Sequence, residues 1–250
     1  MSEVVIPFYL NWSFWTVCVA TLALVLSQLP PIHMIFKRAK LDMELYSRIH
    51  ITHKVGNPNL DLHLILNNIG GKVVRIKEIS ATIKRNGEQI AQLPAQSYLQ
   101  NPDSKTPILL TSFSLKPKEE WAHSVKFLNY FSRNEEKEYR SAEQNLKENI
   151  LNKRELSQNK DILIEADTEY LKTFIRMYKS KFLWSANEYE IQVSIKGKNQ
   201  KANIQKKYRF TLFESDEEEL SKFIQAYKYG DGIFWESGKH PGVIVQIVEA

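Results

Sequence analysis

Leucine occupies every second position from Leu60 to Leu66, and mostly polar residues fill the positions between. Side chains of a β-strand alternate between the two faces of its sheet, so this spacing predicts a strand with one buried face. Turn-forming residues lie on both sides of it, VGNP at 55–58 and NNIGG at 67–71. The most regular segment of the chain is therefore expected to be β.

The same two-residue period recurs along much of the chain. We expect further strands over 41–45, 73–84, 107–115, 121–131, 189–195, 208–212 and 243–248. Asn86-Gly87 follows one of these segments and is typical of a two-residue hairpin turn. A series of about eight to ten short strands separated by turns predicts a β-sandwich.

One stretch of the chain resembles a known class of domain. LDLHLILNNIGGKVVRIKEISATI, followed later by SLKPKEEW, is similar to the immunoglobulin-like sandwich domains of bacterial surface and membrane proteins. The resemblance covers roughly residues 41–131 and implies an immunoglobulin-like β-sandwich. The only cysteine is Cys18, so the Cys–Trp–Cys core of true immunoglobulin domains is absent and the resemblance carries fold alone.

Three segments with helical spacing interrupt the strands. Residues 133–161 mix acidic and basic side chains with a narrow apolar stripe, which predicts a solvent-exposed helical insertion; a coiled-coil surface is the alternative. Residues 167–182 and 215–228 have broader apolar stripes, expected to face the core. Ser215 and Glu218 have the spacing of a capping box. The expected fold class is mainly β with inserted helices (α+β).

The N-terminal segment has a different character. No Asp, Glu, Lys or Arg occurs from Val4 to Phe36. Within it, Tyr9–Leu29 has about the 20 residues that a helix needs to cross a bilayer. We therefore expect a tail and a single transmembrane helix in 1–36, the helix at about 9–29, and a soluble sandwich domain in 37–250. A cleaved signal peptide is the alternative, but the basic leading region that it requires is missing.

Basic residues after this segment predict its direction. Lys37, Arg38, Lys40 and Arg48 follow it closely, and basic flanks remain on the cytoplasmic side. We expect a single-pass protein of the plasma (inner) membrane, with the N-terminus outside and the soluble domain in the cytoplasm. The lipid bilayer would then be its first partner.

Four small residues share one face of the predicted N-terminal helix, Thr16, Ala20, Ala23 and Ser27. Small side chains let a neighbouring helix approach closely. This face predicts packing against another membrane protein or a second copy, although such residues are also common in membrane helices without partners.

The sequence contains no motif for a known chemistry. It has no phosphate-binding loop, no G-x-S-x-G elbow and no dinucleotide fingerprint, and its histidines lack the spacing of a zinc site. We therefore expect no catalytic residue, no cofactor and no metal. The enzyme alternative is a membrane-tethered hydrolase that uses His123 or His240 with an acidic partner.

A basic cluster surrounds the predicted hairpin near residue 200. Its members are Lys196, Lys198, Lys201, Lys206, Lys207 and Arg209. Such a cluster predicts contact with an anionic surface, whereas lysines that protect a strand edge are the plain alternative. We do not expect nucleic acid as the partner, because aromatic residues for base stacking are scarce there.

The segment 227–235 is the densest in aromatic residues and glycine. Tyr227, Tyr229, Phe234 and Trp235 form a candidate partner surface, and a helix cap leading into the core is the alternative. The function that we expect is a membrane-anchored adaptor or assembly subunit that acts by binding. A lipid- or ligand-sensing module is the alternative function.

Overall fold

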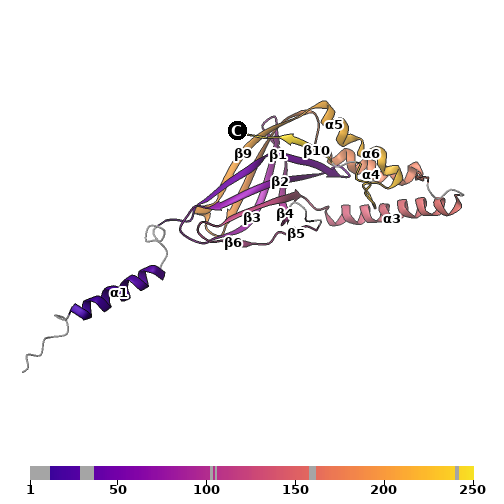
Figure 1. The fold of residues 1–250 in the computed structure, drawn as a ribbon. Coiled ribbons are helices and arrows are strands. Elements are labelled where there is room, and N and C mark those ends of the chain that lie inside the picture. Colours follow the sequence, from indigo (N-terminus) through magenta and orange to yellow (C-terminus); the bar gives the residue numbers. More distant parts are fainter. Residues whose placement is uncertain (1–11, 29–36, 102–103, 105, 158–161, 240–241) are drawn as a thin grey trace, which may run out of the picture.

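The computed structural model describes residues 12–28, 37–101, 104, 106–157, 162–239 and 242–250. Within these residues, eleven strands form one antiparallel sheet (Figure 1). They are β1 (Leu41–Lys54), β2 (Asn57–Asn68), β3 (Val74–Arg85), β4 (Glu88–Leu99), β5 (Ile108–Leu109), β6 (Phe113–Leu115), β7 (Glu120–Leu128), β8 (Asn187–Gly197), β9 (Ile204–Leu212), β10 (Val243–Gln246) and β11 (Val248–Glu249).

The sheet curls until its two ends meet. Its strand order is β10-β1-β2-β7-β4-β3-β8-β9-β11, with β5 paired to β4 and β6 to β3. The first and last strands of this order, β10 and β11, are consecutive in the chain. Between them, the Ile247 N–H donates to the Ser47 carbonyl at 2.9 Å, and just after β11 the Ala250 N–H donates to the Lys207 carbonyl at 2.9 Å. The C-terminal residues therefore connect the two ends of the sheet.

Strand β4 explains why the sheet is continuous. Its first half pairs with β3, up to Ser80 opposite Pro94, and its second half pairs with β7 from Ala95 onward, with a register shift between Ala95 and Ser97. Where β4 separates from β3, the short strand β5 pairs with β4 and the short strand β6 pairs with β3. The prediction of an immunoglobulin-like sandwich is wrong, because β4 pairs with both halves and the described strands form one continuous sheet instead of two stacked sheets.

The inner face of the curled sheet holds the main core. Leu60, Leu62, Leu64 and Leu66 are at most 1% exposed. Trp184, which follows the helical insertion, is also fully buried and donates its indole N–H to the Thr52 carbonyl at 3.2 Å.

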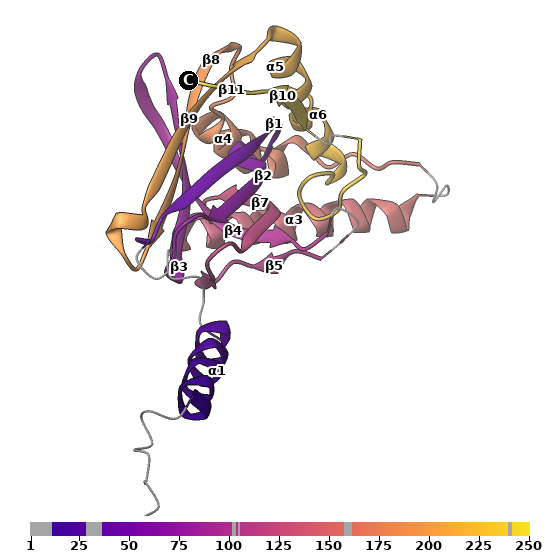
Figure 2. The ribbon, with the colours of Figure 1, turned by 60° about the vertical axis from the view of Figure 1, so that its left-hand side comes forward.

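Helices pack at one end of the sheet (Figures 1 and 2). They are α3 (Arg133–Leu156), α4 (Thr168–Lys181), α5 (Glu214–Ser221) and α6 (Phe223–Ala226), followed by the 3-10 turn η3 (Tyr227–Tyr229). A second 3-10 turn, η2 (Gln200–Ala202), lies between β8 and β9. The helices surround a second core that includes Tyr139, Phe174, Tyr178 and Tyr227.

The N-termini of α3 and α5 are capped by different kinds of residue. Ser132 and Glu135 form a capping box at α3, with the Ser132 N–H donating to the Glu135 carboxylate at 2.8 Å. At α5 the carboxylate of Asp216 accepts from the Phe213 N–H at 2.9 Å, and the helix begins at Glu214. The capping box expected from Ser215 and Glu218 is therefore not formed. The helix begins earlier, and the Asp216 carboxylate accepts the hydrogen bond at its N-terminus.

The N-terminal helix α1 (Trp12–Gln28) has 17 residues. No helix in the described part of the chain is both long enough and apolar enough to cross a membrane. The predicted transmembrane helix is therefore wrong, and the single-pass topology and plasma-membrane location that depended on it fail with it.

Candidate functional site

A large groove lies on the outer face of the sheet, where β8, β9 and β10 approach one another. Its volume is about 970 Å³. The groove is lined by side chains of these strands, most of them outward-facing, by the 86–87 turn and by the start of α5. We call it the seam groove, and its principal lining residues are Lys84, Glu190, Lys207, Arg209, Phe213, Ile244 and Val248.

Strand edges without partners border the seam groove. Strand β10 pairs with β1 on one edge, and no strand within the described residues pairs with its other edge. Strand β9 pairs with β11 only at Tyr208 and Arg209, so its last residues pair with no strand on that side within the described residues, although β10 lies nearby. Unpaired strand edges present backbone donors and acceptors to an incoming chain.

Three apolar side chains in the groove are exposed to solvent. Phe213 is 61% exposed, Ile244 is 68% exposed and Val248 is 63% exposed. Single exposed apolar residues are ordinary, but these three line the same concavity. They supply an apolar floor beside the open strand edges.

Among the described residues, the ion pairs of the seam groove include Lys84 and Lys207 but not Arg209. The Glu190 carboxylate lies 3.7 Å from the Lys84 ammonium and 3.3 Å from the Lys207 ammonium. Arg209, which lies opposite Glu190 in the β8–β9 register, has no ion pair among the described residues. Its guanidinium is available to a carboxylate from outside the chain.

The six residues of the predicted basic cluster do not form one patch. Lys196 pairs with Glu78 at 3.1 Å, and Lys206 lies on the inner face, where it pairs with Glu249 at 3.5 Å. Lys198 and Lys201 lie around η2 at the hairpin tip. Only Lys207 and Arg209 reach the seam groove.

The aromatic segment after α6 divides in a similar way. Tyr227 is 1% exposed, and burial raises the pKa of its hydroxyl, which has no hydrogen-bond partner among the described residues. Phe234 lies against Gly230, where φ is +79° and an added Cβ would come within 2.0 Å of the Phe234 ring. Tyr229 and Trp235 line a smaller pocket of about 380 Å³. Two of the four predicted surface aromatics therefore belong to the core.

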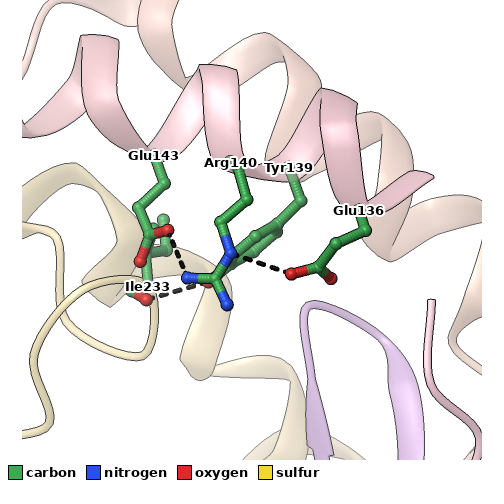
Figure 3. Close-up of polar contacts among 5 residues, drawn as sticks. All are labelled: Glu136, Tyr139, Arg140, Glu143 and Ile233. Carbon is green, nitrogen blue, oxygen red and sulfur yellow. Dashed lines mark hydrogen bonds and ion pairs between the residues drawn. The ribbon is translucent and has the colours of Figure 1, made fainter. Parts of the chain in front are cut away.

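Contacts from α3 hold the same segment in place. The Tyr139 hydroxyl donates to the Ile233 carbonyl at 2.8 Å (Figure 3). Beside it, Arg140 is held between Glu136 at 2.8 Å and Glu143 at 3.0 Å. Burial raises the pKa of Tyr139, so the hydroxyl remains a donor at physiological pH.

The histidines do not converge on a hydrolytic site in the described residues. The His123 ring contacts Tyr98 and Trp121 and has no hydrogen-bonded carboxylate there, while His240 lies outside the described residues. His63 lies 3.4 Å from the Ser124 hydroxyl. Asp61 hydrogen-bonds to His50 instead, at 3.0 Å.

Two further predictions concern metal binding and α1. Within the described ranges no three His, Cys, Asp or Glu side chains are grouped as metal ligands.

On α1, the hydroxyls of Thr16 and Ser27 donate to carbonyls of their own helix. Ala20 and Ala23 are exposed with them, so the predicted packing face has no partner within the described chain.

Sequence reasoning missed the apolar floor of the seam groove. The run Val243–Val248 is apolar in both phases, at Ile244 and Val248 as well as at buried Val243, Val245 and Ile247. A strand with one solvated face would carry polar residues in one phase. This excess of apolar residues could have indicated, from the sequence, an apolar surface on the outer face of the sheet.

Comparisons with known proteins supply no functional identity. No family model and no curated protein matches the chain. A crystal structure of a protein from Archaeoglobus fulgidus matches at 9% identity and a TM-score of 0.26, covering 70% of this chain and 98% of that one. A likeness at this level carries no argument about function.

Proposed function

We propose that this protein acts by binding, as a non-enzymatic adaptor that receives an extended segment of a partner protein in the seam groove. The observation that carries the proposal is the edge of β10 that pairs with no strand within the described residues and that borders a groove of about 970 Å³. An extended peptide gains main-chain hydrogen bonds at such an edge and gains specificity from alternate side chains.

The groove suits a segment with alternating apolar and acidic residues. Every second side chain of an added strand would face Phe213, Ile244 and Val248, whose exposed surfaces would be buried. An acidic residue on the segment would pair with Arg209, whose planar guanidinium binds carboxylates through two parallel hydrogen bonds.

The first experiment identifies peptides and then tests the groove. Short random peptides are selected by phage display against the purified chain, and the enriched peptides are synthesised and measured by fluorescence polarisation. We expect alternating apolar and acidic sequences whose affinity falls about tenfold or more in Arg209→Glu and in Ile244→Asp. Lys198→Glu is the matched control, since it reverses a charge at the exposed hairpin tip.

A second measurement tests strand addition itself. Methylating peptide amide nitrogens one at a time removes one donor at each position. In an added strand, only alternate amides face the protein, so loss of affinity should recur at every second residue. Equal effects at all positions, or binding that is indifferent to Arg209→Glu and Ile244→Asp, would contradict the proposal.

A further inference from the structure

We infer that the pocket beside Trp235 binds a small anion carried on a planar ring. The pocket has a volume of about 380 Å³, within the usual range for small-molecule sites. It lies between α6, the segment around Leu163 and the loop 228–239, and it shares no lining residue with the seam groove. The inference is therefore independent of the proposed adaptor function.

The aromatic wall of this pocket is held in place before any ligand arrives. The Trp235 indole N–H donates to the Tyr229 carbonyl at 2.8 Å, and the Tyr229 hydroxyl donates to the Glu165 carboxylate at 2.8 Å. Trp235 remains 36% exposed. An indole that is fixed through its N–H offers its face for stacking at little cost in conformational entropy.

The loop that carries Trp235 is closed by its own hydrogen bonds. The carboxylate of Asp231 accepts from the Ser237 N–H at 2.8 Å and from the Ser237 hydroxyl at 2.5 Å. The Gly232 N–H donates to the Trp235 carbonyl at 2.8 Å. The charge of Asp231 is therefore engaged inside the loop, and the wall is preorganised.

Three lysines line the pocket and differ in their partners. Lys222 pairs with Glu219 at 2.9 Å, and Lys228 pairs with Glu165. Lys239 has no ion pair among the described residues, although it lines the same pocket. An anion held beside Trp235 would meet the Lys239 ammonium first, and the two exposed ion pairs, which are weak in water, could rearrange toward it.

Phosphate and carboxylate are both anions that a lysine ammonium can hold, so the experiment separates the two sources. Isothermal titration calorimetry with the full chain uses AMP as a ring with a phosphate and indole-3-acetate as a ring with a carboxylate. Adenosine supplies a ring without the anion, and inorganic phosphate supplies the anion without a ring. We expect at least one of the first two to bind with a Kd below about 1 mM, and both controls to bind about tenfold more weakly or worse.

Variants then place the ligand in the pocket. Lys239→Gln should weaken binding about fivefold to tenfold, while the matched change Lys201→Gln at the exposed hairpin tip should leave it unaltered. Trp235→Leu should weaken binding through loss of the ring, and Trp235→Phe should retain most of it. Circular dichroism at each step shows whether the variants remain folded.

Three results would overturn the inference. One is no binding of AMP or indole-3-acetate at millimolar concentration. Another is binding of inorganic phosphate or adenosine as tight as that of the ring-bearing anions. The third is binding that is unchanged in folded Lys239→Gln and Trp235→Leu. None of these results depends on peptide binding in the seam groove, so failure here leaves the adaptor proposal to its own test.

Discussion

His53 of β1 donates a hydrogen bond from Nε2 to the Leu220 carbonyl at the end of α5, at 3.0 Å. Its Nδ1 accepts from the Gly56 N–H at 3.1 Å, so the ring is neutral with the proton on Nε2. The rings of Tyr178, Phe182 and Phe223 surround it. One buried imidazole thus connects the β1–β2 turn to the helices.

The burial of His53 predicts a pH-dependent stability. Burial lowers its pKa from 6.5 to about 4. Because the unfolded chain binds this proton more readily, stability is fully present above pH 6.5 and falls as the pH drops toward 4, by about 3 kcal/mol in total. Urea denaturation from pH 7.5 to 4 should show this slope, and the slope should shrink in His53→Phe. An equal slope in both proteins would assign the effect to other groups.

Removing the hydroxyl oxygen of Tyr139 should lower the free energy of unfolding, because this hydroxyl donates a hydrogen bond to the Ile233 carbonyl. Tyr139→Phe leaves the Ile233 carbonyl without its buried donor, which should lower the free energy of unfolding by about 1–2 kcal/mol. Tyr130→Phe is the control, since Tyr130 is 68% exposed. Thermal denaturation of both variants checks the difference; similar melting temperatures would show that the bond contributes little.

Gly230 and Gly87 allow backbone strain to be separated from steric overlap. Both have positive φ, +79° and +81°, but a Cβ on Gly87 meets nothing within 4 Å, whereas one on Gly230 meets the Phe234 ring. We expect Gly87→Ala to cost about 1 kcal/mol through strain. Gly230→Ala should cost about 2–4 kcal/mol, because overlap with the ring adds to that strain. Chemical denaturation measures both, and equal losses would exclude a steric contribution.

Two neighbouring positions in β10 test how the sheet ends are joined. Val245 is 7% exposed and faces the core, while Gln246 faces solvent. Val245→Asp buries a carboxylate and should lower stability by about 3–5 kcal/mol. Gln246→Asp should change it by no more than about 0.5 kcal/mol. If both variants unfold at the same urea concentration as the parent, β10 does not contribute to the stability of the sheet.

The sequence by itself determined the buried face of its most regular strand and the apolar stripe of its longest helical segment, but it did not predict β4 over Glu88–Leu99. The alternation from Leu60 to Leu66 reappears as four buried leucines, and the narrow stripe of α3 reappears as buried Tyr139, Leu146 and Ile150. Gly230 ends its helical segment in the left-handed conformation. These features are local, because side-chain period and backbone φ depend on neighbouring residues alone.

Only the tertiary structure decided how the strands are joined and where the sites lie. Alternation is the same for two stacked sheets and for one curled sheet, so it could not reveal that β4 pairs with both β3 and β7. The apolarity of the N-terminal segment likewise did not reveal that no helix in the described residues is long and apolar enough to cross a membrane. The seam groove brings together Arg209 and Ile244, which are distant in the chain, because β10 returns to the edge beside β9. Such long-range pairing depends on the register of the whole sheet, which no local pattern contains.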